Sequence, residues 1–365
     1  MAALIPQIET ALQHWTAPYL QTDLVTAGCL RRIRVDQNVA SIEIEFGFPI
    51  SAQQRDNIDT DLQQHIKQAL PELSHIALDI RWRVANHESH SKAAPMRRVS
   101  NLIAVASGKG GVGKSTTAVN LALALTAEGA RVGLLDADIY GPSIPVMMGI
   151  APDARPDTRD QKYFVPMQAH GVQLMSMGVL VTEQTPMVWR GPMASGALQQ
   201  LLNQTLWDEL DYLLIDMPPG TGDIQLTLSQ SAPLTAAVVV TTPQDIALLD
   251  ARKGIEAFRK IHTPVLGIIE NMSMHTCSQC GHTEHIFGAG GGERIAEEYQ
   301  VPLLGSLPLD RHIREQAGSG TPTVAAEPAG KLASYYREIA LNMAAQLSRL
   351  PVSNSIPGVV QVKNE

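Results

Sequence analysis

The run from Gly108 to Ser115 is the first group of residues whose types and spacing suit chemistry, because it satisfies the pattern G-x4-G-K-[ST]. An apolar run over Leu102–Ala106 precedes it, and a helical stretch over Ser115–Glu128 follows it. Glycines let backbone N–H groups converge on phosphate oxygens, and the start of the following helix adds positive potential there. The sequence therefore predicts a phosphate-binding loop between a strand and a helix.

Two side chains of this loop would act on the bound phosphates. Lys114 can reach the β- and γ-phosphates, and the Ser115 hydroxyl can ligate Mg²⁺. The alternative interpretation is a glycine-rich turn with an exposed lysine, which the flanking strand and helix disfavour. We therefore expect a nucleotide with its Mg²⁺ at this loop.

Three carboxylates follow apolar runs further along the chain. Asp136 and Asp138 come after Val132–Leu135, and Asp216 comes after Leu213–Ile215. Ligands of open parallel sheets bind at the carboxyl ends of the strands, so these acids are expected beside the phosphate loop. A single acid at a strand end is often only a turn former, but three in order after a phosphate loop favour a role at the nucleotide.

Cys277 and Cys280 form the second group suited to chemistry, with His275, His282 and His285 close by. Thiolates spaced C-x2-C can share one metal or cluster, because the spacing brings both sulfurs to one side of a turn. A 4Fe–4S cluster generally needs four ligands, and one chain supplies only this close pair. A symmetric dimer would supply the pair twice, around one cluster on its two-fold axis.

Other interpretations of the thiol pair stay open at this point. Zinc within one chain could use both cysteines with His282 and His285, although this spacing is tighter than that of usual zinc fingers. A redox pair would prefer the start of a helix in a thioredoxin-like unit, and inert surface thiols are the third alternative. Cys29 stands alone in an apolar context and is predicted to fill the core.

The first 85 residues are predicted to form a small α+β domain that precedes the phosphate loop. Apolar residues recur at helical spacing over 8–15 and 58–70, and they alternate with polar ones over 42–46 and 76–82. With a further strand over 30–35, the element order is α-β-β-α-β. Such a unit would place its helices on one face of a sheet.

From residue 99 the pattern changes to short apolar runs that alternate with helical stretches. Fully apolar strands separated by helices indicate a parallel sheet that is covered on both faces, so we expect a doubly wound α/β domain over 99–350. Residues 86–98 are polar and contain Pro95, which predicts an interdomain linker with two solvated histidines, and 351–365 reads as a flexible tail. The predicted strands are Leu102–Ala106, Val132–Leu135, Leu213–Ile215, Ala236–Val240, Val265–Ile269 and Leu303–Leu304.

Composition narrows the classes of protein further. Hydrophobic residues make up 44% of the 365 and charged residues 18%, which excludes a disordered chain, and three cysteines are too few for a disulfide framework. The sequence shows no secretory signal and no apolar window of membrane-spanning length, so we expect a cytoplasmic protein. The net charge of −8 gives no general attraction to nucleic acid or to an anionic membrane, and neither is expected as a partner.

Lys109, directly after the first glycine of the loop, resembles the signature of the deviant Walker A ATPases, the group of MinD, ParA and the nitrogenase iron protein. The resemblance implies that Lys109 crosses a dimer interface to the partner's phosphates and makes hydrolysis depend on dimer geometry. It also implies that Asp138 orients the attacking water, that Asp136 acts near Mg²⁺ and that Asp216 holds Mg²⁺ through water.

Seven stretches together resemble the Mrp/ApbC family of iron–sulfur cluster carrier ATPases over nearly the whole chain, and the N-terminal unit resembles the small iron–sulfur-assembly domain of bacterial members. The segment TTPQDIALLDARKG and the thiol pair after ENMS separate this family from MinD and ParA. The stretches are SGKGGVGKST (107–116), DADIYGPSIP (136–145), RGPMASGALQQ (190–200), DMPPGTGDIQL (216–226), TTPQDIALLDARKG (241–254), ENMS with CSQCG (270–281) and HIFGAGGGERIAEEY (285–299).

The resemblance implies an ATP hydrolase that binds ATP, Mg²⁺ and a labile 4Fe–4S cluster bridging a homodimer. It would exchange the cluster with scaffold proteins and with acceptor apoproteins. The rival hypotheses are a positioning ATPase of the MinD/ParA type, an electron-transfer protein like the nitrogenase iron protein, and a zinc-binding regulatory ATPase. The nucleotide contacts it implies are Gly108, Lys109, Gly110, Gly111, Val112, Gly113, Lys114, Ser115, Thr116, Asn271 and Pro308, with Lys109, Lys114 and Asp138 catalytic, Cys277 and Cys280 on the cluster, and Ser115, Asp136 and Asp216 on Mg²⁺.

Overall fold

The computed structural model describes residues 4–89, 91, 93–139, 141–180 and 191–353. The chain divides into two compact units, one of residues 1–85 with 344–350 and one of residues 86–343 with 351–365. Most of the predicted tail, together with Tyr140 and Arg190 of the family-like stretches, lies outside the described residues.

The first unit has the element order expected from its hydrophobic pattern. The stripe of Ile58, Leu62 and Ile66 is buried on one face of its long helix. Ser51 caps the start of that helix by accepting the N–H of Gln54 at 3.4 Å. The elements are α1 (Leu4–Gln13), β1 (Leu30–Asp36), β2 (Val39–Phe46), α2 (Ala52–Ala69) and β3 (His75–Trp82), with β2 antiparallel to β1 and parallel to β3.

The second unit is built on an eight-stranded sheet in the order β15-β12-β11-β4-β10-β5-β9-β8. Neighbouring strands are parallel throughout except at β8, which runs antiparallel to β9. All six strands predicted in this region are present, and β8 and β9 are additional. The bounds are β4 (Val99–Ala106), β5 (Val132–Asp136), β8 (Met167–Ala169), β9 (Val172–Ser176), β10 (Leu210–Asp216), β11 (Ala236–Thr241), β12 (Val265–Glu270) and β15 (Leu303–Ser306).

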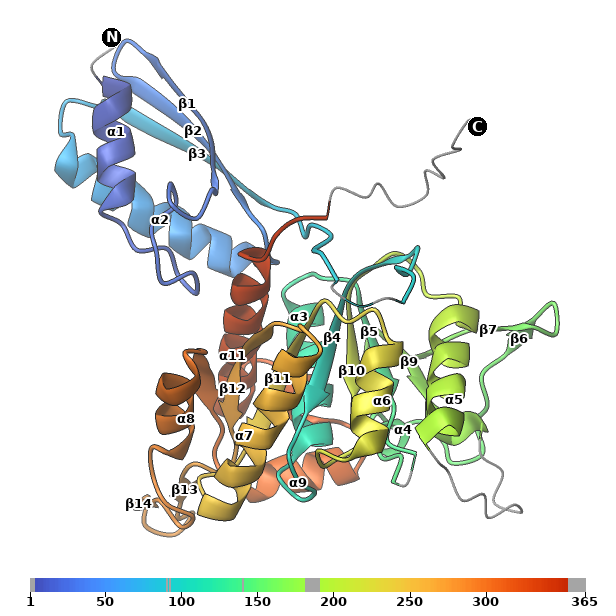
Figure 1. The fold of residues 1–365 in the computed structure, drawn as a ribbon. Coiled ribbons are helices and arrows are strands. Elements are labelled where there is room, and N and C mark those ends of the chain that lie inside the picture. Colours follow the sequence, from blue (N-terminus) through green and yellow to red (C-terminus); the bar gives the residue numbers. More distant parts are fainter. Residues whose placement is uncertain (1–3, 90, 92, 140, 181–190, 354–365) are drawn as a thin grey trace. The chain divides into compact units, whose positions relative to one another are not determined.

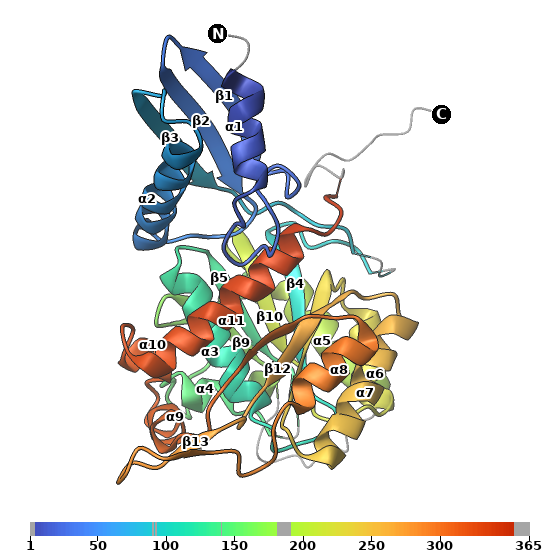
Figure 2. The same cartoon turned by 90° about the vertical axis from the view of Figure 1, so that its left-hand side faces the viewer.

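Helices cover both faces of this sheet, which confirms the doubly wound α/β fold (Figures 1 and 2). One face packs into a core shared with α5 (Gly191–Gln204), α6 (Asp223–Ser231), α7 (Asp245–Lys260) and α8 (Gly291–Tyr299). The other face carries α3 (Lys114–Ala127) and residues 331–343 of α11 (Lys331–Ser348). The shorter elements are α4 (Ile144–Met147), β6 (Thr158–Arg159), β7 (Tyr163–Phe164), η1 (Met177–Leu180), β13 (His275–Thr276), β14 (Thr283–Glu284), α9 (Arg311–Gly318) and α10 (Thr323–Ala326).

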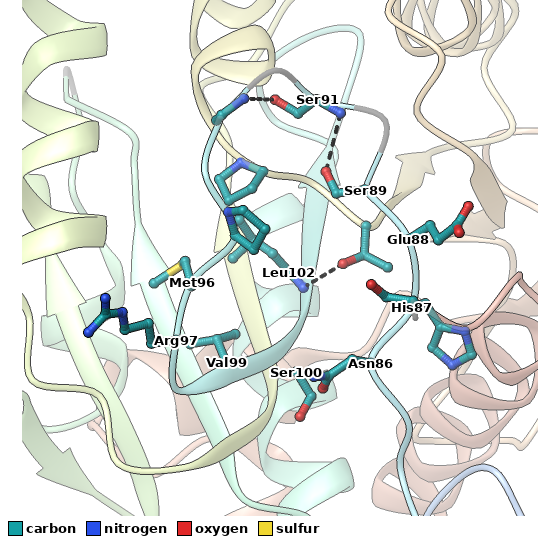
Figure 3. A pocket seen from close by; sticks show the side chains of 15 residues that line it. Asn86, His87, Glu88, Ser89, Ser91, Met96, Arg97, Val99, Ser100 and Leu102 are labelled. Atoms are coloured by element: carbon teal, nitrogen blue, oxygen red, sulfur yellow. Dashed lines mark hydrogen bonds between the residues drawn. The ribbon is translucent and has the colours of Figure 1, made fainter. Parts of the chain in front are cut away.

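The polar stretch 86–98 docks on the second unit, so the expectation of solvated histidines is wrong for His87. His87 is 6% exposed, and its backbone pairs with that of Val352. Ser89 donates its hydroxyl to the carbonyl of Leu234 at 2.9 Å, and Ser91 N–H donates to the Ser89 hydroxyl (Figure 3). The second histidine, His90, lies outside the described residues.

The docked stretch borders a cavity of about 480 Å³ where β4 begins (Figure 3). The phosphate loop follows the other end of β4, roughly 20 Å away at the usual rise per strand residue. This cavity is therefore separate from the predicted nucleotide site. Among the residues that the structure describes, no helix combines the length and the apolar character needed to cross a membrane.

Candidate nucleotide and thiol sites

The parallel register brings the predicted site residues to one edge of the sheet. Asp216 at the end of β10 lies opposite Asp136 of β5 and opposite Val105 of β4. On the other side of β4, Ala106 lies opposite Val239 of β11. The loop from β4 to α3 starts at this edge, and two of the three predicted carboxylates, Asp216 and Asp136, end the two strands that follow β4 on one side of the sheet.

Glycines shape the phosphate loop at two positions where nothing larger fits. A Cβ on Gly108 would lie 2.2 Å from the backbone carbonyl of Asp250 in α7, so the loop lies directly on that helix. Gly113 has a φ of +81°, and a Cβ there would lie 2.2 Å from the side-chain nitrogen of Asn271. Gly110 and Gly111 are exposed at the turn of the loop, whereas Val112 is buried beneath it.

Lys114, Ser115 and Asp216 form a compact polar cluster at the start of α3. The Lys114 ammonium forms a buried ion pair with Asp216, and the Ser115 hydroxyl donates to the other oxygen of that carboxylate at 2.6 Å. Burial raises the pKa of Asp216, and the Lys114 charge works against that rise. A hydroxyl beside a carboxylate is the kind of oxygen donor set that Mg²⁺ prefers, so these residues fit a magnesium nucleotide.

Asp136 is fully buried and orders the loop that follows β5. Its carboxylate accepts the N–H of Asp138 at 3.1 Å, the N–H of Ile144 at 3.2 Å and the hydroxyl of Ser176 at 3.4 Å. Burial, and next the charge of Asp216, raise its pKa to about 7. The half-buried Asp138 is thereby held at the same sheet edge. The roles of Asp136 near Mg²⁺ and of Asp138 on water stay predictions.

A cavity of about 580 Å³ opens beside the loop and is the natural place for a base. Thr116, Asn271 and Pro308, which lie far apart in the sequence, line it together. The sequence does not predict its apolar walls, which include Met147 of α4 and Ile313 of α9. Apolar walls with a few polar groups suit a purine, and Asn271 is one such group.

Lys109 is half-buried, and its Nζ lies 3.5 Å from the side-chain oxygen of Gln244. Gln244 is the residue before α7, the helix whose Asp250 carbonyl lies against Gly108. Gln244 is absent from the predicted site residues, although it belongs to the family-like stretch TTPQDIALLDARKG. Its contact shows that this stretch borders the phosphate loop.

The two clustered cysteines lie in a short hairpin formed by β13 and β14. Within the turn, Cys277 N–H donates to the carbonyl of His282 at 2.8 Å, and Gly281 N–H donates to the carbonyl of Cys277 at 2.9 Å. Cys277 is half-buried and Cys280 is exposed. Backbone N–H groups of Gln279 and Cys280 lower the pKa of Cys277, which favours the thiolate that metals bind. Both thiols are therefore accessible from outside the chain.

Two histidines near the thiol pair bond backbone carbonyls, and Cys29 is buried in the first unit. His275 and His285 each use Nδ1 on a backbone carbonyl, at 3.1 Å and 2.6 Å. Across the described part of the chain, no three His, Cys, Asp or Glu side chains are grouped so as to hold a metal ion. Cys29 is 4% exposed, and burial raises its pKa to about 11, as expected of a core residue.

A doubly wound sheet with this loop and this ion pair defines a P-loop nucleotide-binding protein. More particularly, residues 98–344 match the family of NUBPL iron-transfer P-loop NTPases, and residues 6–77 match a family of iron–sulfur cluster assembly proteins. Because the first match covers more than half of the chain, the protein belongs to the NUBPL iron-transfer P-loop NTPase family. This membership confirms the resemblance inferred from the sequence.

Relatives extend the similarity over both units. An iron–sulfur cluster carrier protein of Pseudomonas fragi is 61% identical over 269 residues, which covers 74% of this chain and 94% of the relative. One of Haemophilus influenzae is 51% identical over 347 residues, covering 93% of this chain and 91% of the relative. A solved nucleotide-binding protein of Archaeoglobus fulgidus in complex with ADP is 36% identical with a TM-score of 0.55, covering 62% of this chain and 88% of that one.

Proposed function

We propose that this protein carries a labile iron–sulfur cluster on Cys277 and Cys280 and passes it to acceptor apoproteins under the control of a bound nucleotide. The observation that carries the proposal is the accessible thiol pair, held in a hairpin that follows β12 from the sheet edge that also bears the phosphate loop. Family membership and the names of the relatives support it.

The thiol pair suits a cargo that must leave again. Two sulfurs per chain cannot enclose a 4Fe–4S cluster, so two copies of the chain would hold one cluster between them. Cys280 is exposed and Cys277 half-buried, which leaves room for the thiolates of an acceptor. Acceptor thiolates then replace the two sulfurs of each chain one for one, and the cluster keeps its oxidation state.

The phosphate loop makes ATP with Mg²⁺ the proposed nucleotide, and we propose that the chain hydrolyses it. When bound, the metal ion neutralises charge on the β- and γ-phosphates. Lys114 would pass from Asp216 to the phosphates, while Ser115 and Asp216 hold the ion. Lys109 would act on the partner's nucleotide, so that hydrolysis requires the homodimer.

Anaerobic reconstitution with iron and sulfide tests the carrier function. The wild-type protein is expected to take up about two iron and two sulfide per chain, or one 4Fe–4S cluster per dimer. Cys277→Ser and Cys280→Ser are each expected to lose the iron chromophore. Cys29→Ser is the matched control and should keep it, because Cys29 lies buried in the first unit. One zinc per chain without an iron chromophore would contradict the proposal.

A further inference from the structure

A series of hydrogen bonds joins the phosphate loop to the segment that leads into the thiol hairpin. Asn271 donates its side-chain N–H to the carbonyl of Val112 at 2.8 Å and its backbone N–H to the carbonyl of Thr241 at 2.8 Å. Two residues later, Ser273 donates both its N–H and its hydroxyl to the carbonyl of Leu307, at 2.9 and 3.1 Å. Asn271 and Ser273 are both buried, so this segment is fixed between the loop and the end of β15.

The same segment forms one wall of the base cavity and carries the root of the hairpin. Met272 and Leu309 line the cavity. Leu309 N–H donates to the carbonyl of Met274 at 2.7 Å, and His275 Nδ1 donates to the carbonyl of Leu309 at 3.1 Å. His275 is the first residue of β13, so a molecule that fills the cavity contacts Leu309, which hydrogen-bonds the residues from which the hairpin starts.

His285 attaches the returning strand of the hairpin to this wall. It directly follows β14, and its Nδ1 lies 2.6 Å from the carbonyl oxygen of Ser273. Because a carbonyl can only accept, Nδ1 carries the hydrogen and donates it. This bond joins residues 273 and 285, so the segment between them, which contains both cysteines, is attached at both of its ends. Without it, the hairpin would be attached through its outgoing strand at His275.

We propose that His285 is a positioning residue that makes the thiol hairpin follow the nucleotide state of the base cavity. This inference rests on the proposed carrier function, because the coupling would let the bound nucleotide control the exposure of Cys277 and Cys280 to an acceptor. A nucleotide shifts the hairpin only if it binds two arrangements of the cavity wall with different affinity, and the His285 bond is what transmits that difference to the returning strand.

Alkylation of the metal-free, full-length protein tests this inference without a cluster. N-ethylmaleimide labelling of Cys277 and Cys280 is followed by mass spectrometry with and without saturating Mg-ADP, and buried Cys29 should stay unlabelled as an internal check that the protein remains folded. In the wild type, Mg-ADP should change the labelling rate by about fivefold, a modest coupling between two sites. In His285→Gln the labelling rates with and without Mg-ADP should become equal. The glutamine amide lies near the Nε2 position rather than the Nδ1 position, so it cannot replace the bond to Ser273.

The matched variants separate positioning from a general loss of structure. His285→Asn places an amide N–H near the position of Nδ1 and should restore the nucleotide effect. His282→Gln alters an exposed histidine of the same hairpin and should leave the effect as in the wild type. The inference is overturned if wild-type labelling ignores bound Mg-ADP, if His285→Gln keeps the wild-type ratio, or if His285→Asn loses it. Reconstitution of the cluster is measured separately, so either proposal can fail without the other.

Discussion

At the scale of single residues, Lys109 and Lys114 are expected to contribute to different parts of the nucleotide reaction. Lys114 is buried against Asp216 at the start of its own helix, whereas Lys109 is half-buried beside Gln244. Lys114→Ala should weaken both nucleotide binding and hydrolysis. Lys109→Ala should lower turnover by at least about 100-fold while the affinity stays near that of the wild type, because its contact would form only in the closed dimer.

Steady-state phosphate release and equilibrium binding of a fluorescent ATP analogue check this difference. Lys114→Ala leaves the buried carboxylate of Asp216 without its cation, so its thermal unfolding must be compared with that of the wild type before its activity is interpreted. Equal turnover in wild type and Lys109→Ala would remove the role assigned to Lys109.

The sequence predicts those site residues that belong to a local sequence motif or that stand at the end of an apolar strand. The loop from Gly108 to Ser115 is one such pattern, and Asp216 follows from the rule that parallel strands end at one edge. The sequence does not single out Gln244, and it places His285 near the thiol pair without predicting its bond to the Ser273 carbonyl. Gln244 contacts Lys109 only because the fold brings the two residues together. His285 bonds a backbone carbonyl, and since every residue type has one, the sequence carries no signal for this bond.

At the scale of elements, the contact of the phosphate loop with α7 is expected to fix the loop's position. Gly108→Ala would push a methyl group into the carbonyl of Asp250, and overpacking of this kind costs about 1–3 kcal/mol of folding free energy. The helix backbone cannot yield as a flexible side chain would, so the loop should shift. We therefore expect a lower melting temperature together with weaker nucleotide binding.

Gly110→Ala is the matched control for this contact. Of the residues that the structure describes, only Pro219 comes within contact distance of a Cβ at Gly110, at 4.0 Å, so a methyl group has room there. Differential scanning fluorimetry with and without Mg-ADP compares the two variants. If Gly108→Ala melts and binds like Gly110→Ala, the close approach to α7 is irrelevant to the loop.

The predicted and the unpredicted strands differ in the continuity of their apolar residues. The six predicted strands are continuous apolar runs because both of their faces are covered by helices. β8 is an edge strand and β9 is its neighbour in the sheet, and the polar residues Gln168 and Gln173 interrupt the apolar pattern of these two strands. The sequence does not predict the cavity walls formed by α4 and α9 either, because only long-range packing brings Met147 and Ile313 to the same cavity.

At the scale of the whole molecule, distant parts of the chain share structure that composition does not reveal. The polar composition of 86–98 predicts an interdomain linker and does not reveal its backbone partners: the N–H of Glu88 donates to the carbonyl of Pro351 at 3.0 Å, and the N–H of Ser353 donates to that of Asn86 at 2.8 Å. These partners lie at opposite ends of the second unit's sequence. Pairing through backbone groups depends on the path of the chain rather than on residue type.

The dimer invoked for both the cluster and Lys109 can be tested by mixing two inactive variants. In a mixed dimer of Lys109→Ala with Lys114→Ala, the first chain keeps Lys114 at its own phosphates and receives Lys109 from its partner, so one site is complete. The other site lacks both lysines. Random exchange at equal concentrations makes half of the dimers mixed, so the mixture should regain about a quarter of the wild-type turnover. If Lys109 acted within its own chain, no site in any dimer would be complete, and the mixture would be no more active than its components.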